Sequence, residues 1–135
     1  MKMKSILVLV LGTCFLFSVS MAQPKKAAPW ATPDKYKTMK NPTKADEKTL
    51  ADGKALWNKH CKSCHGAKGL GDGPKAAGLK TAAGDFSSKD FQGQSDGVIF
   101  YRTTIGRDEM PNYTKSIPND EDRWKLVTYM RTMKK

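Results

Sequence analysis

Two cysteines and a histidine lie close together near the middle of the chain. Cys61 and Cys64 are three positions apart, and His65 follows Cys64 directly. On a helical turn, residues three or four positions apart share one face, so both sulfurs and the imidazole can reach the same flat ligand. The pattern Cys-x-x-Cys-His is typical of a covalently attached c-type haem. It predicts that Cys61 and Cys64 bond the haem vinyl groups and that His65 is an axial ligand of the iron.

Three other interpretations of the cysteine pair stay open at this point. A structural zinc ion needs four ligands, and the remaining candidates are only the neighbouring His60 and the distant Cys14. A thioredoxin-like redox pair needs a βαβ setting, which the sequence does not indicate. A disulfide between Cys61 and Cys64 would leave the glycine-rich stretch after His65 unexplained. Haem attachment accounts for more of the sequence than any of these.

The stretch after His65, residues 66–74, is rich in glycine and is therefore predicted to be a loop. It lacks the Lys-Ser/Thr ending of a phosphate-binding loop, so nucleotide binding is not expected. Its glycines suit a backbone that passes close to a flat ligand. An axial histidine generally donates its second N–H to a carbonyl or carboxylate, and the carbonyl of Pro74 is the candidate acceptor.

A thioether sulfur is a common sixth ligand of c-type haem iron, and Met110 is the candidate. It lies in a polar stretch and precedes Pro111, so no helical stripe accounts for it. The other methionines of the exported chain lie in an extended segment or on a predicted helical stripe: Met39, Met130 and Met133. His60 is the rival ligand, but it is next to Cys61 on the proximal side. We therefore predict His65 and Met110 as the two axial ligands.

Helical patterns place these residues. The first predicted helix runs from about Thr43, as N-cap with Asp46 as its acidic partner, to about residue 62. Its apolar stripe is Leu50, Gly53, Leu56, Trp57 and Cys61. A short helix capped by Ser95 runs to about Ile105, and the last helix is capped by Asn119. Phe86 and Phe91 are expected to pack in the core at positions that the sequence does not define.

The N-terminus has the pattern of a secretory signal peptide. A basic start, an apolar run from Ile6 to Val19 and a small-x-small ending predict a signal in residues 1–22, cleaved near Ala22. A lipoprotein signal at Cys14 is a weaker alternative. Residues 23–42 hold four prolines and one large apolar side chain, Trp30, and are predicted to form a linker or a strap laid on the domain. Trp30 is either unattached or pins the strap over a haem edge, and the sequence favours neither. Residues 43–135 are long enough for one small domain.

The exported chain is strongly basic. Loss of Lys2 and Lys4 leaves 22 basic side chains against 13 acidic ones. This charge predicts attraction to acidic surfaces, while export and the lack of a recognition motif argue against nucleic acid. Five lysines surround the cysteine pair against the single acid Asp72, and they are Lys59, Lys62, Lys68, Lys75 and Lys80.

From about Asp46 to Lys135, the chain resembles a monohaem class I c-type cytochrome. The resemblance is carried by the Cys61-x-x-Cys64-His65 motif, Gly73-Pro74, Met110-Pro111 and residues 124–131 of the last helix. It implies a small all-α cytochrome c fold, with three to five helices around one covalently bound haem c. It also implies crossing of the first and last helices, a bond from His65 to the Pro74 carbonyl, and a partly exposed haem edge. The Pro-rich strap lies outside the common pattern.

The predicted function is that of an exported, periplasmic electron carrier rather than an enzyme. With His65 and Met110 both bound, iron has no vacant position, which favours outer-sphere electron transfer and no small-molecule substrate. The expected partners are redox proteins with acidic docking surfaces. The alternative is a haem subunit of a larger periplasmic or membrane oxidoreductase complex, docked through the strap. A catalytic or gas-sensing protein would require an open iron site.

Overall fold

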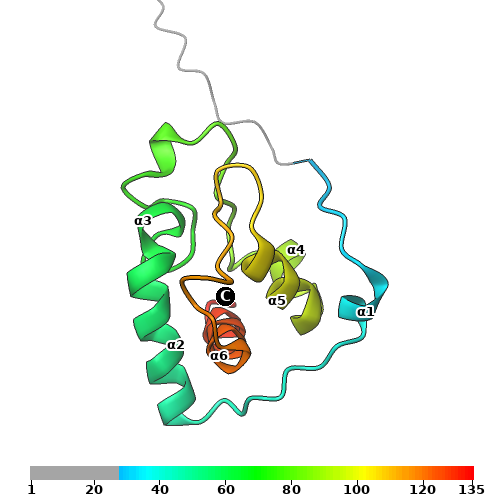
Figure 1. Ribbon diagram of the computed structural model, residues 1–135. Helices are drawn as coiled ribbons and strands as arrows, with labels where there is room; N and C mark the ends of the chain where they lie inside the picture. The colour runs from blue at the N-terminus through cyan, green and yellow to red at the C-terminus, as the bar shows by residue number, and fades with distance from the viewer. Residues whose placement is uncertain (1–27) are drawn as a thin grey trace, which may run out of the picture.

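The computed structural model describes residues 28–135, and this part of the chain is helical, which confirms the predicted all-α fold (Figure 1). The three longer helices are α2 (Glu47–His60), α5 (Asp96–Ile105) and α6 (Asp120–Arg131). The shorter elements are α1 (Asp34–Lys37), α3 (Lys62–His65), a 3₁₀ turn (Ala76–Gly78) and α4 (Lys89–Gln92). None of the helices in this described range is long and apolar enough to cross a membrane. The predicted signal peptide, including Cys14 and Ala22, lies outside the described residues.

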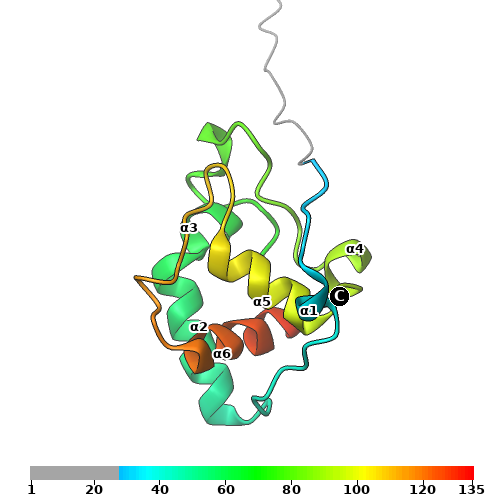
Figure 2. The same cartoon turned by 45° about the vertical axis from the view of Figure 1, so that its right-hand side comes forward.

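The first and last long helices cross, as the sequence predicts. Helix α6 packs against α2, and both views show the two helices crossing with α5 beside them (Figures 1 and 2). Gly53 lies at the crossing, because a Cβ atom there would meet the backbone carbonyl of Lys125 and would lie 2.8 Å from Tyr129 Cβ. The glycine therefore allows a closer approach of the two backbones than any other residue would.

Side-chain caps start the long helices, and one of them differs from the prediction. Ser95 and Asn119 cap α5 and α6 as predicted, each accepting a backbone N–H in the first turn. Helix α2, however, is capped by Asp46, whose carboxylate accepts the N–H of Thr49 at 2.8 Å. The prediction of Thr43 as the cap was wrong, because its hydroxyl bonds Thr128 on α6 at 2.7 Å.

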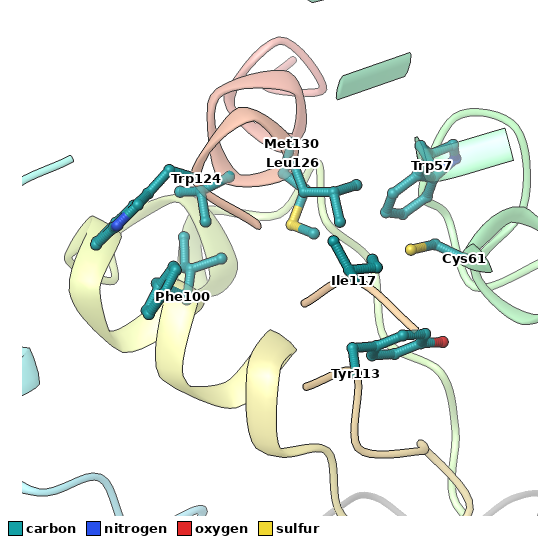
Figure 3. Packing of buried hydrophobic residues seen from close by; sticks show 10 residues of the cluster. Trp57, Cys61, Phe100, Tyr113, Ile117, Trp124, Leu126 and Met130 are labelled. Carbon is teal, nitrogen blue, oxygen red and sulfur yellow. The ribbon is translucent and has the colours of Figure 1, made fainter. Parts of the chain in front are cut away.

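The hydrophobic core joins α2, α5 and α6 to the loop that follows Met110. Trp57 and Leu126 are fully buried, and Trp124 stacks on Phe100 with ring centroids 4.0 Å apart. Figure 3 shows the Cys61 side chain pointing into this cluster beside Trp57. The core therefore ends at the first cysteine of the motif, so the motif is attached to the most rigid part of the molecule.

The described part of the predicted strap, residues 28–42, runs along α5 and then crosses to α2 (Figures 1 and 2). Helix α1 packs against α5, where Tyr36 lies against Tyr101 with ring centroids 4.6 Å apart. Near the end of the segment, the Asn41 side chain donates to Thr128 Oγ1 at 2.9 Å. The segment thus packs against the helical domain at Tyr36 and is hydrogen-bonded to it at Asn41.

Candidate functional site

A single large cavity collects the predicted site residues. Its volume is about 740 Å³, which is in the usual range for a ligand site. Cys61, Cys64, His65 and Met110 all line it, although Met110 is separated from the motif by 45 positions in the sequence. His60 also lines the cavity, whereas Pro74 does not. The structure therefore brings together four of the five predicted residues.

The end of α2 and the single turn α3 position the cysteine pair. Cys61 follows the last residue of α2, and its carbonyl accepts the N–H of His65 at 3.0 Å, which closes the turn that carries Cys64. Both cysteines are free thiols, so the disulfide alternative is contradicted. In residues 28–135, no group of three or more Cys, His, Asp or Glu side chains is placed to hold a metal ion.

The two thiols differ in burial. Cys61 is only 5% exposed, whereas Cys64 is half-buried at the cavity wall. Burial, with a smaller contribution from the neighbouring Cys64, raises the pKa of the Cys61 thiol to about 12. A buried thiol with so high a pKa is a poor nucleophile and a poor redox group in the folded chain. Thioredoxin-like chemistry is therefore disfavoured at this pair.

The imidazole of His65 has a buried nitrogen without a hydrogen-bond partner. Its Nδ1 atom is shielded from solvent and unpaired, and burial lowers the pKa of His65, with the backbone of Ala83 partly opposing this effect. The neutral ring suits ligation of a metal ion. Phe86 flanks the imidazole, with ring centroids 4.7 Å apart. No hydrogen bond joins His65 to Pro74 among the described residues, so the role of the Pro74 carbonyl stays a prediction.

The glycine-rich loop folds back along α3, as its composition predicts. Three backbone N–H groups of the loop donate to carbonyls of the motif: Gly71 to His65 at 3.0 Å, Gly73 to Cys64 at 3.2 Å and Lys75 to Ser63 at 2.8 Å. Gly73 has no room for a side chain, because a Cβ atom there would lie 2.5 Å from the Ser63 carbonyl oxygen. The loop therefore fixes the orientation of the motif from outside.

Met110 is held at the cavity by a tight turn. Arg107 and Met110 exchange two backbone hydrogen bonds of 2.9 Å, and Asp108 between them adopts a positive φ of 53°. Glu109 ties this turn to the opposite loop, since its carboxylate accepts the backbone N–H groups of Lys80 at 2.8 Å and Thr81 at 3.1 Å. This tie could not be predicted from the sequence, because the partners of Glu109 are backbone groups.

Several cavity residues were missed or left unplaced by the sequence. Phe86 and Phe91 stack with ring centroids 4.2 Å apart, and both line the cavity. Trp30, Arg102 and Arg107 line it as well. Arg102 could have been noticed as a charged residue within an apolar helix, but the position of Trp30 depends on tertiary contacts alone.

The donor set and the cavity fit a covalently attached haem. Two thiols at the wall suit thioether bonds, a neutral imidazole with an unpaired buried nitrogen suits iron ligation, and aromatic walls suit a flat apolar ring. Cys61 and Cys64 would attach the group, and His65 and Met110 are the two candidate iron ligands. The backbone carbonyl of His60 accepts the hydroxyl of Tyr113 at 2.9 Å.

Comparisons with known proteins agree with this geometry. The family model described as Cytochrome c matches residues 50–134. One similar structure, the Kuenenia stuttgartiensis reducing HAO-like protein complex Kustc0457/Kustc0458, is 30% identical with a TM-score of 0.62, and the match covers 70% of this chain and 47% of that chain. This chain thus spans about half of that one. Another, the KustC0563 c-type cytochrome, is 32% identical with a TM-score of 0.53, over 62% of this chain and 99% of that chain.

No curated protein matches the chain. The family match covers more than half of the sequence, and it includes the cysteine pair, His65 and Met110. The similar structure that is matched over nearly its whole length is a c-type cytochrome. The chain therefore belongs to the cytochrome c family, with covalently bound haem c as its cofactor and haem-based electron transfer as its chemistry.

Proposed function

We propose that this chain is an exported, periplasmic electron carrier that passes single electrons between redox proteins, with His65 and Met110 as the axial iron ligands. The observation that carries the proposal is the meeting of His65 and Met110 at one cavity with both cysteines. A bound haem supplies the reversible one-electron change between ferric and ferrous iron.

The residues around the cavity support a carrier more than an enzyme. His65 and Met110 together fill both axial positions, so no position is left for a substrate. The tie from Glu109 to Lys80 and Thr81 and the bond from Tyr113 to His60 hold the Met110 loop in place. A fixed ligand pair keeps the site similar in both redox states, which suits outer-sphere transfer.

A basic surface around the motif supports docking to acidic partners. The five lysines between positions 59 and 80 are all exposed, and they lie on the end of α2, on α3, on the glycine-rich loop and on the segment that follows this loop. Positive charge beside the attachment site would steer an acidic redox partner toward it. Salt would weaken this attraction, because exposed charges are screened over about 8 Å at physiological ionic strength.

The axial ligands are tested by spectroscopy of the ferric protein. A far-red sulfur-to-iron absorption band is expected in the native protein and in Met39→Ala, a control at an exposed methionine outside the cavity. The band should disappear in Met110→Ala. If it survives that substitution, Met110 is not the ligand. A native protein without the band would favour His60 or an open site, and with it a catalytic or gas-sensing function.

The basic surface is tested by rates of electron exchange with an anionic probe. Ferricyanide should oxidise the ferrous protein more slowly as salt is added. Lys62→Glu combined with Lys68→Glu should reduce both the rate and its salt dependence. Lys40→Glu combined with Lys44→Glu makes the same change of charge away from the motif and should have a smaller effect. Equal effects of the two pairs would contradict a local docking surface.

The second candidate function is that of a haem-bearing subunit of an oxidoreductase complex. It is favoured by the similarity to a chain of the HAO-like protein complex, of which this chain spans 47%. A stable complex that co-purifies with the mature protein and is lost when residues 23–42 are deleted would support it. A mature protein that stays monomeric and exchanges freely between partners would support the carrier.

A further inference from the structure

The first described residues of the chain form part of the cavity wall. Ala28, Pro29 and Trp30 line the cavity together with Arg102 of α5 and Arg107 of the following turn. These three residues precede the part of the chain that matches the cytochrome c family, residues 50–134. The family match therefore does not account for this side of the haem site.

Arg102 binds residues 30–32 through two of its donor groups and the residue before Ser95, the cap of α5, through a third. Its Nη2 donates to the Trp30 carbonyl at 2.6 Å, and its Nε donates to Thr32 Oγ1 at 3.1 Å. Its Nη1 donates to Gln94 Oε1 at 2.6 Å, which fixes the guanidinium relative to the start of α5. Three bonds to one planar group define its orientation, so the backbone at Trp30 is held in a single place.

The indole ring of Trp30 lies against two guanidinium groups. The Cζ atom of Arg107 is 4.6 Å from the ring centroid and that of Arg102 is 5.8 Å from it, both within cation–π range. Arg107 also donates from Nη1 to the Ala28 carbonyl at 2.8 Å. Both arginines thus donate hydrogen bonds to the segment. Because the two arginines already donate to this segment, they suit a fixed part of the cavity wall better than a surface that docks a partner.

The wall lies where it can meet the cofactor. The cysteines come from the α2–α3 side of the cavity, and the two arginines come from α5 and the turn after it, on the other side of the fold (Figure 1). A ring attached at Cys61 and Cys64 that fills this cavity contacts the residues lining the rest of it. Trp30 is one of these, and it contributes the largest apolar side chain from outside the matched domain.

We propose that Trp30, clamped by Arg102 and Arg107, is a haem-contacting wall that keeps water out of the cavity and raises the reduction potential. Exclusion of water disfavours the more highly charged ferric state, and two nearby guanidinium groups act in the same direction. The proposal depends on haem in the cavity, which the family provides, and not on the identity of the sixth ligand or the redox partners.

The direct test uses the native haem protein and its tryptophan signals. The chain has three tryptophans, so three indole N–H signals are expected in a ¹⁵N NMR spectrum, and Trp30→Phe identifies one of them. The Trp30 signal should shift strongly between the ferric and ferrous protein, because paramagnetic iron displaces nearby resonances. Trp124, which does not line the cavity, serves as the reference. A Trp30 signal that moves no more than that of Trp124 would overturn the proposal.

The second test measures the reduction potential by titration. Trp30→Ala should lower the potential, and Trp30→Phe should lower it less because an apolar ring remains. Thr38→Ala, an exposed neutral change in the same segment, should leave it unchanged. An unchanged potential in Trp30→Ala would also overturn the proposal, while leaving the axial ligands and the carrier function untouched. If Trp30→Ala does not yield haem protein, the NMR comparison decides.

Discussion

The hydroxyl of Tyr113 donates a hydrogen bond of 2.9 Å to the backbone carbonyl of His60, and this bond joins the Met110 loop to the end of α2. Tyr113 is 7% exposed, and its own N–H donates to the Thr104 carbonyl at 2.9 Å. Two bonds therefore fix the residue that follows Met110 by three positions. The loop that carries Met110, the proposed axial ligand, is therefore tied directly to the helix that precedes the attachment motif.

Removal of the Tyr113 hydroxyl should make the Met110 loop less firmly attached to α2 and the protein less stable. Tyr113→Phe leaves the partly buried His60 carbonyl without its partner and should lower the free energy of unfolding by about 1–2 kcal/mol. Denaturant titration of the haem protein measures this loss. The far-red band of the ferric protein should also weaken at a lower temperature than in the native protein. Unchanged stability together with an unchanged band would show that the bond does not hold the loop.

The two cysteines should each account for one covalent bond to the cofactor. Cys61→Ser and Cys64→Ser should each keep the haem through the remaining thioether. One vinyl group then stays unsaturated, so the reduced pyridine haemochrome band should move to longer wavelength. The double variant should release its haem into acidified organic solvent. Ser63→Ala, between the two cysteines, is the control, and a single variant with the native band would contradict the assignment.

Glu109 should protect two amides of the opposite loop. Its carboxylate accepts the N–H groups of Lys80 and Thr81. In Glu109→Ala, these amides should exchange with solvent deuterium roughly fivefold faster, the equivalent of about 1 kcal/mol for a lost hydrogen bond. The amide of Tyr113, which donates to the Thr104 carbonyl, should be much less affected. Equal acceleration at all three positions would indicate a general loss of stability instead.

Gly53 should not tolerate a side chain at the helix crossing. In Gly53→Ala, the added methyl group meets backbone and Cβ atoms of α6, which cannot move aside easily. The clash should outweigh the gain in helix propensity and leave a net loss of about 1–2 kcal/mol. Gly78→Ala is the matched control, because a Cβ atom there meets nothing within 4 Å. A neutral Gly53→Ala would mean that the helices can separate without cost.

Lys125 should stabilise the fold in a pH-dependent way. Its ammonium lies 3.2 Å from Asp52 and 3.3 Å from both Glu121 and Asp122, and the bonds to Asp52 and then Asp122 contribute most to raising the pKa of Lys125. Bonds from Lys48 and then Lys125 lower the pKa of Asp52. The stabilisation that comes from the charge of Lys125 is complete below pH 10.5, the ordinary pKa of lysine. It is lost as the pH rises through the higher pKa that Lys125 has in the folded protein. The stabilisation that comes from the charge of Asp52 is complete above pH 3.8, the ordinary pKa of aspartate. It is lost as the pH falls through the lower pKa that Asp52 has in the folded protein.

The measurement is the melting temperature of Lys125→Met against that of the native protein. The difference should be largest between pH 3.8 and 10.5 and should shrink on either side. Added salt should reduce it only in part, because the Lys125 side chain is 14% exposed. Lys54→Met, an exposed change on α2, is the control. A difference that does not vary with pH would point to lost packing rather than lost charge.

Residues with local signals were predictable from the sequence. Ser95 and Asn119 cap their helices within a few positions of their partners, so a short window contains the whole interaction. Thr43 has the same local signal as a cap, but Thr128 on the last helix is its partner in the fold. Which residue caps a helix then depends on tertiary contacts, and these join residues that are far apart in the sequence.

The candidate site was likewise predictable where its signals are local in the sequence. The motif at Cys61–His65 is local. Met110 was chosen as the candidate ligand because no helical stripe accounts for it, and it does line the cavity. Trp30 and Phe86 were not placed, since both reach the cavity from segments without periodicity. The loop that ends at Pro74 turns where expected, and the bond of its carbonyl to the His65 side chain stays a prediction.

The burial of Cys61 has a consequence for biogenesis. Its sulfur points into the core beside Trp57, and that core closes only when α6 docks on α2 (Figure 3). A maturation enzyme that forms the first thioether needs access to this sulfur, so we expect it to act on a nascent, still open polypeptide. Haem attachment would then precede the final folding step. A chain that folded before attachment could no longer receive its haem.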